Sequence, residues 1–271
     1  MILDVVCKRD SIFINEGKNT LIEEFGKDYG MYFSIMSAIA SGYTKRSEIE
    51  DLVGKELGGY LTKLEDDYNL IKKRQPLFEK SKSTNVRYKL ADNFFIFWFR
   101  FIFKYNYMIE IGAYDKLKAI IERFSGLALE RYFVDLFIES GNYTRIGSWW
   151  DRKGENEIDI IAENELEQSA VFFEVKRQQR RIELNKLETK KNTFLSTTKQ
   201  FKNYTIACKS ISLDDMWFWD CKKTVSWTKN IILNVFITRT EKTKQSTSFS
   251  LHHWPHDAFY FIFSFLIIAL L

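Results

Sequence analysis

The stretch that decides the fold of this chain is EIDIIAENELEQSAVFFEVKRQ, residues 157–178. Two apolar runs, at 157–162 and 170–176, flank a polar connection, and this pattern predicts two neighbouring β-strands. Charged side chains interrupt the second run, because Glu174 lies inside it and Lys176 follows where a buried strand usually carries an apolar residue. These charges require either a partner or a function.

The hairpin register determines where the charges lie. We take Ala162 to lie opposite Val171 across the connection. Antiparallel pairing then puts Asp159 directly opposite Glu174, with both side chains on the same face. Two carboxylates about 5 Å apart repel each other unless a cation or a proton lies between them. Lys176, two residues along that face, reaches the same position.

Two interpretations of these charges follow. In the first, Asp159 and Glu174 hold a divalent cation while the ammonium of Lys176 orients or activates water beside it. In the second, Glu174 and Lys176 form an ion pair on the solvated face of an edge strand. The apolar residues around the charges and the elements that precede the hairpin favour the first interpretation.

Those preceding elements form a recognisable order. Apolar residues at three-to-four spacing predict a long helix that ends at Gly141, and residues 145–150 predict a further strand. The order helix, strand, strand, strand resembles the core of the PD-(D/E)XK nuclease superfamily. This resemblance implies Mg2+ or Mn2+ as a cofactor held by Asp159 and Glu174. The catalytic residues that it implies are Glu130, Asp159, Glu174 and Lys176. Ile158 stands where the motif's name has a proline.

Residues 31–92 carry the pattern of a winged helix-turn-helix. Three helical patterns, near 32–42, 47–53 and 60–70, precede two basic strands around the polar turn EKSKSTN. In such domains the third helix enters the major groove and the hairpin contacts phosphate. The residues that this assigns to DNA binding are Lys63 on the helix and Lys80, Lys82 and Arg87 on the hairpin.

Acidic residues limit what this third helix can recognise. Glu65, Asp66 and Asp67 lie on it and would repel phosphate, so we expect salt-sensitive DNA binding with little sequence preference. The alternative interpretation is a small helical packing unit with a solvated hairpin.

An aromatic run, NFFIFWFRFIFKYNYMI at residues 93–109, follows the hairpin. Arg100 and Lys104 interrupt it, and it is too short to span a membrane. We therefore predict a buried linking helix at this position.

Composition agrees with a folded protein of modest charge. The chain has 271 residues, of which 45% are hydrophobic and 16% aromatic, enough for two modest domains. A net charge of +4 is too small to identify a nucleic-acid partner by itself. Three cysteines without metal-ligand spacing, and no apolar signal sequence at the start, predict a cytoplasmic location.

Four segments also carry a family resemblance: EEFGKDYGMYFSIMSAIASG, RYKLADNFFIFWFRFIF, SWWDRKGENEIDIIAE and FFEVK. From Asn19 to Met216 the chain resembles the C-terminal half of archaeal and bacterial ATP-binding proteins that carry the domain of unknown function 234. The resemblance implies an AAA+-like P-loop ATPase, then a winged helix, then a nuclease-like domain. No GxxxxGK[ST] motif occurs in this chain, so we expect no ATP site and no ATPase activity here. DNA and a separately encoded ATPase are the expected partners.

The expected fold class is α/β (α+β), with a mixed central sheet in the nuclease-like part. The predicted divisions are a remnant of a missing ATPase domain at 1–30, a winged helix at 31–92, linking helices at 93–123, a PD-(D/E)XK nuclease-like domain at 124–216 and an atypical C-terminal tail at 217–271. The tail fits an altered gene end or a short membrane anchor. Its histidines, His252, His253 and His256, lack further metal-binding neighbours apart from Asp257 and do not favour a metal site.

Two functions are therefore expected from the sequence. The first is a Mg2+-dependent phosphodiesterase that acts on DNA. The second is a non-catalytic DNA-binding or regulatory half of a truncated or split ATPase, in which the charged strand pair is retained for structure.

Overall fold

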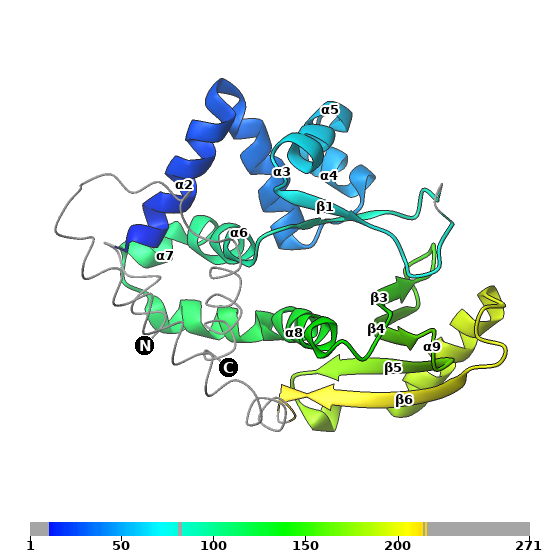
Figure 1. Ribbon diagram of the computed structural model, residues 1–271. Helices are drawn as coiled ribbons and strands as arrows, with labels where there is room; N and C mark the ends of the chain where they lie inside the picture. The colour runs from blue at the N-terminus through cyan, green and yellow to red at the C-terminus, as the bar shows by residue number, and fades with distance from the viewer. Residues whose placement is uncertain (1–10, 81–82, 214, 216–271) are drawn as a thin grey trace, which may run out of the picture. The chain divides into compact units, whose positions relative to one another are not determined.

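The computed structural model describes residues 11–80, 83–213 and 215. In this part of the chain, helices combine with a two-stranded sheet and a four-stranded mixed sheet (Figure 1). The predicted α/β class with a mixed sheet is confirmed. The predictions for Lys82 and for the tail from residue 217 onward concern residues outside the described part.

The first of two compact units contains residues up to Ala128 together with the segment 147–157. Helices α3, α4 and α5 precede a β-hairpin, which is the order predicted for residues 31–92. The elements of this unit are α2 (Ile12–Phe25), η1 (Gly26–Asp28), α3 (Tyr29–Ser41), α4 (Arg46–Val53), α5 (Gly58–Thr62), η2 (Lys63–Asp67), β1 (Ile71–Arg74), β2 (Arg87–Leu90), α6 (Asn93–Phe97), η3 (Trp98–Phe103) and α7 (Asn106–Glu110).

The second unit contains residues 129–146 and continues from Ile158. Helix α8 (Tyr114–Ser140) enters it without a break at the predicted boundary between residues 123 and 124, and ends before Gly141 as predicted. Strand β3 (Arg145–Trp150) begins in this unit and continues into the segment 147–157 of the first unit. The remaining elements are β4 (Glu157–Asn164), β5 (Ser169–Lys176), η4 (Gln179–Arg181), α9 (Leu184–Thr197) and β6 (Thr205–Ser212). These strands and β3 form a sheet in the order β3-β4-β5-β6.

The pairing of β4 with β5 has the register expected from the sequence. Ala162 lies opposite Val171, and the pairing continues to Ile160 opposite Phe173. Strand β6 pairs with β5 in parallel, and α9 provides the crossover that a parallel pair needs. The sheet is therefore antiparallel on one side of β5 and parallel on the other.

Helices pack on both faces of β5. The ring of Phe173 lies 4.8 Å from that of Phe137 on α8, centroid to centroid. The neighbouring ring of Phe172 points to the other face and lies 5.6 Å from Phe194 on α9. Successive side chains of a strand alternate between faces, so burial on both sides explains why this strand is almost continuously apolar. Glu174 lies on the α9 face.

The aromatic run is almost entirely buried over residues 93–102, as predicted, but its later part carries exposed aromatic rings and the run is not one continuous helix. Asp92 caps α6 by accepting a hydrogen bond from Phe94 N at 2.5 Å, and the chain then forms the π-helical turn η3 before α7 begins at Asn106. Arg100 interrupts the run for a structural reason, because its Nη1 donates to Ala40 O at the end of α3 (2.8 Å). In the described residues, no helix combines the length and the apolar character that crossing a membrane requires.

Helix α2 is longer than the sequence indicated. Only residues 20–25 show a helical pattern, but α2 begins at Ile12 because it packs on an indole ring of the aromatic run. Trp98 Nε1 donates to Ile14 O at 3.2 Å, and a Cβ added to Gly17 would lie 2.5 Å from the same nitrogen. Glycine is required here by this close approach, which no local pattern reveals.

This contact predicts the effect of adding one methyl group to α2. Gly17→Ala should lower the free energy of unfolding by about 1–3 kcal/mol, because overpacking against Trp98 exceeds the gain of up to about 1 kcal/mol in helix propensity. Gly30→Ala provides the control, since a Cβ at Gly30 in α3 meets no atom within 4 Å. Urea unfolding should show no loss for Gly30→Ala, and equal stability of the two variants would contradict the packing argument.

Candidate functional site

The acidic residues predicted to share a site lie on adjacent strands of the second unit. Asp159 precedes the Ile160 to Phe173 pair on β4, and Glu174 follows it on β5. Asp159 Oδ2 accepts a hydrogen bond from Val175 N at 2.8 Å, which holds its carboxylate beside β5. The strand register therefore brings these two carboxylates together.

Lys176 lies between the two carboxylates. Its Nζ is 3.3 Å from Asp159 Oδ2 and 3.1 Å from Glu174 Oε1. Burial lowers the pKa of Lys176, but the charge of Asp159 and the hydrogen bond and charge of Glu174 raise it, so that the pKa lies above its usual value. The side chain is thus an ammonium at neutral pH, and it offsets the repulsion between the acids.

Glu174 is only partly satisfied by this arrangement. It is 6% exposed, and in the described part of the chain its Oε2 is buried without a hydrogen-bond partner. Lys190 on α9 approaches the other oxygen, Oε1, at 4.0 Å. A buried carboxylate oxygen without a hydrogen-bond partner lowers the stability of the fold. Glu174 Oε2 can therefore still accept a hydrogen bond or bind a cation.

Glu130 does not complete a set of three acids. Among the residues that the structure describes, no three His, Cys, Asp or Glu side chains converge as a metal site. The reason lies in the faces of the sheet: α8, which carries Glu130, contacts β5 through Phe137 and Phe173, whereas Glu174 lies on the face that α9 covers. Glu130 is half-buried on α8. The candidate centre therefore consists of Asp159, Glu174 and Lys176.

A hollow of about 430 Å³ lies next to this centre. Its lining residues are Gln179, Ile182, Glu183, Leu184, Asn185 and Ser210. Ser210 is the strand partner of Glu174, which places one wall of the hollow beside the acids. The segment between β5 and α9 also carries Arg177, Arg180 and Arg181, of which the last two are exposed. Sequence reasoning missed this basic segment, although the run KRQQRR at 176–181 was a visible signal.

Two other buried groups of the second unit have structural partners. Glu163 is fully buried, and its Oε1 accepts hydrogen bonds from Gln200 Nε2 at 3.0 Å and Tyr204 OH at 2.9 Å. Its Oε2 has no hydrogen-bond partner among the described residues but forms an ion pair with Arg145 Nη1 at 3.5 Å. Burial, followed by a hydrogen bond with Glu188, raises the pKa of the Cys208 thiol to about 11. Cys208 is therefore protonated at neutral pH and is a poor nucleophile.

The residues predicted to contact DNA lie in the first unit. Lys63 begins η2 and Lys80 follows β1, and both side chains are exposed. The hairpin register adds a basic face that the sequence did not reveal, because Lys72 lies opposite Lys89 and Arg74 lies opposite Arg87. Residues two apart on a strand share a face, so these four side chains form the basic hairpin face: Lys72, Arg74, Arg87 and Lys89.

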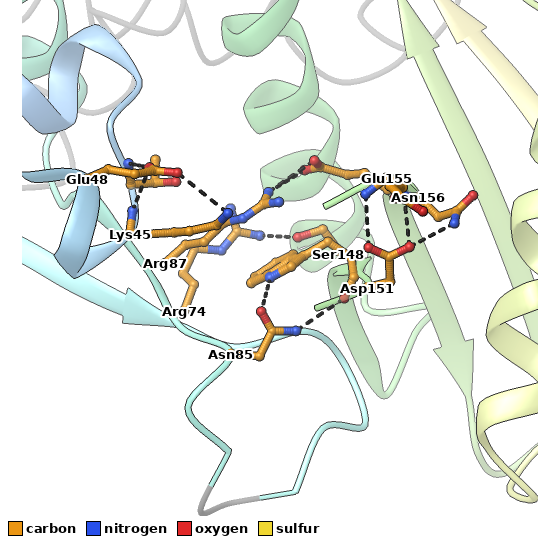
Figure 2. A network of polar contacts seen from close by, with 12 residues as sticks. Lys45, Glu48, Arg74, Asn85, Arg87, Ser148, Asp151, Glu155 and Asn156 are labelled. Carbon is orange, nitrogen blue, oxygen red and sulfur yellow. Dashed lines mark hydrogen bonds and ion pairs between the residues drawn. The ribbon is translucent and has the colours of Figure 1, made fainter. Parts of the chain in front are cut away.

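Arg74 and Arg87 of the basic hairpin face contact the segment 147–157 (Figure 2). Arg87 Nη1 donates to both carboxylate oxygens of Glu157 at 3.0 Å, and its Cζ lies 4.5 Å from the centroid of the Trp150 ring. Arg74 Nη2 donates to Ser148 Oγ at 2.6 Å. The predicted DNA contact of Arg87 thus coincides with an ion pair inside the protein.

Comparison with known proteins gives one family match. Residues 98–195 match the family described as archaea bacterial proteins of unknown function, the domain of unknown function 234 (DUF234). The predicted resemblance to this family is confirmed over that range, which contains the acids and lysine of the candidate centre. An uncharacterized protein of Methanocaldococcus jannaschii is 33% identical over 186 residues. The aligned part covers 64% of this chain but only 42% of that relative. No solved structure matches.

The bridging position of Lys176 predicts its effect on stability. Lys176→Met should lower the free energy of unfolding by about 1–2 kcal/mol at neutral pH, because Asp159 and Glu174 then face each other without a cation. This value is below that of a fully buried pair because the Lys176 side chain is 35% exposed. Urea unfolding tests it, with Lys186→Met in the exposed pair with Glu183 as the control. Equal losses in the two variants would show that the bridge is unimportant.

Proposed function

We propose that this chain is a Mg2+-dependent phosphodiesterase of the PD-(D/E)XK type that acts on DNA. The observation that carries the proposal is the cluster in which Asp159 and Glu174 share the ammonium of Lys176. The order of elements supports it, since a helix, three strands, a helix and a further parallel strand surround the cluster.

The two carboxylates suit Mg2+ as the metal. Mg2+ is usually held by one or two carboxylates and completes its octahedron with water and substrate phosphate oxygens. Asp159 and Glu174 would hold it, and the unpartnered Oε2 of Glu174 is an available ligand atom. When bound, the metal would supply Lewis-acid stabilisation of the charge that develops on the phosphate.

The protein's own groups would position the substrate. Lys176 is an ammonium, so it can donate to a phosphate oxygen or to the attacking water but cannot accept a proton. Lys190, 4.0 Å from Glu174, adds a second positive charge on the α9 side. Arg180 and Arg181 extend this positive region beside the hollow, where they can neutralise neighbouring phosphates.

The first unit would supply much of the affinity for DNA. We propose that α3 to β2 form a winged helix-turn-helix that contacts phosphates through Lys63, Lys80 and the basic hairpin face. The acidic side chains of η2 would repel DNA phosphates, so we do not expect this element to recognise bases. One of these acids, Glu65, accepts a hydrogen bond from Lys73 N at 2.9 Å within the protein. Binding would therefore depend on salt more than on sequence.

A second candidate function is a non-catalytic DNA-binding or regulatory half of an ATP-binding protein. Two observations favour it: Lys176 already neutralises the acids, and the described residues hold no group of three metal-binding side chains. The expected partner is then an ATPase encoded by a separate gene, because no P-loop motif occurs in this sequence. On this alternative the charged cluster has only a structural role.

Metal binding and cleavage separate the two candidates. Mg2+ or Mn2+ should raise the melting temperature of the wild-type protein, because it binds the native state and not the unfolded chain. Asp159→Asn should abolish that gain, whereas Lys176→Met should keep it and lose duplex cleavage. Thermal melts and a gel assay on labelled duplex measure the two effects. A wild-type protein that is indifferent to both metals and does not cleave would favour the non-catalytic function.

Salt dependence tests the DNA contacts of the first unit. Replacing Lys63 and Lys80 together by glutamine should weaken binding of every duplex sequence by a similar factor. The slope of log K against log salt should become shallower by about 1–2, since each lost phosphate contact contributes about 0.9. Lys18 and Lys104, two exposed lysines of the same unit, provide a control with the same change of charge. If both double variants lose equal affinity, the effect is one of net charge and not of these contacts.

A further inference from the structure

The segment 147–157, which we call the clasp, presents the hairpin with groups like those of a nucleotide (Figure 2). The carboxylate of Glu157 accepts from Arg87 in the way that a phosphate could, and the ring of Trp150 makes a cation–π contact with the same guanidinium at 4.5 Å. Ser148 offers a hydroxyl to Arg74. Arginine binds phosphates by charge-assisted hydrogen bonds and stacks on bases through its planar face. The clasp therefore uses the contacts that nucleic acid would use.

The ion pair between Arg87 and Glu157 is partly exposed to solvent and leaves one donor of Arg87 without a partner in the described part of the chain. The Glu157 side chain is 48% exposed, which makes its pair with Arg87 accessible to water and salt. Arg87 Nε is buried and has no hydrogen-bond partner among the described residues. The carboxylate thus leaves one donor of the guanidinium unused, and a phosphate group has more acceptor oxygens to offer.

The clasp also has internal bonds that would survive its release. Asp151 Oδ1 accepts from Glu155 N at 2.9 Å, and its Oδ2 accepts from Asn156 N at 3.1 Å and Asn156 Nδ2 at 2.7 Å. The contacts that would break join the clasp to the hairpin: Trp150 Nε1 donates to Asn85 Oδ1 at 3.0 Å, and Leu77 N donates to Ser148 O at 2.9 Å. These internal bonds close the turn between β3 and β4, so the clasp would separate from the hairpin together with the ends of these two strands.

We propose that the clasp is an autoinhibitory contact that competes with nucleic acid for Arg74 and Arg87 on the basic hairpin face. This inference rests on the proposed DNA binding of the first unit. Nucleic acid gains these two contacts only when residues 147–157 move away, so the free chain binds more weakly than its basic face permits.

A substitution that removes one negative charge tests whether the clasp competes with nucleic acid. Glu157→Gln removes the charge that holds Arg87 and should raise affinity for a short fluorescein-labelled duplex about fivefold at low salt, the effect of an ion pair near the upper end for exposed pairs. Glu155→Gln removes the same charge from the same loop, but Glu155 is exposed and its carboxylate is not the one that binds Arg87. Fluorescence anisotropy on both full-length variants should show the increase for Glu157→Gln alone.

The outcomes separate this inference from the proposed function. Equal affinities of Glu157→Gln and Glu155→Gln, with measurable wild-type binding, would overturn the clasp and leave DNA binding intact. Absence of salt-sensitive binding in the wild type and both variants would overturn the proposed DNA binding itself.

Hydrogen exchange gives a readout that needs no variant. Saturating the wild-type protein with duplex should speed amide exchange in residues 147–157, because the clasp loses its contacts, and should slow it in β1 and β2. Slower exchange in both the clasp and the hairpin would contradict displacement and would show that nucleic acid binds over the closed clasp.

Discussion

The antiparallel pairing of β4 with β5 is the constraint on which the candidate centre depends. It places Asp159 beside Glu174 and gives Lys176 a position between them. A slip of one residue would turn the side chains of one strand to the opposite face. The apolar residues fix this register, since Phe172 and Phe173 must each reach a separate helical layer.

Charge balance inside the second unit follows from this geometry. Two acids on one buried face would destabilise the sheet, and Lys176 supplies the compensating charge from the same strand. The compensation is incomplete, because Glu174 Oε2 lacks a partner in the described structure. A purely structural ion pair would gain from satisfying that atom, whereas a metal-binding site uses it. This unpartnered oxygen is the reason for proposing the catalytic interpretation ahead of the structural one.

The two units differ in whether their arginines are neutralised by neighbouring groups or exposed to solvent. On the hairpin, Arg87 is neutralised by Glu157 and covered by Trp150, so its charge is held within the protein. After β5, Arg180 and Arg181 are exposed beside the hollow that adjoins the acids. Net charge could not reveal this contrast, because it sums over residues whose fields are cancelled locally and residues whose fields reach the solvent.

The sequence alone predicted strands β3, β4 and β5, and an assumed register of Ala162 opposite Val171 placed Asp159 beside Glu174, because side-chain alternation with period two is a local property. It did not predict α9 or β6. Tertiary structure decided what depends on neighbours far away in the chain. Glu130 lies on the helix of the opposite sheet face, Arg87 meets a carboxylate 70 residues later, and Gly17 packs on an indole ring. No periodicity encodes these contacts, since they arise only when separate elements pack against each other.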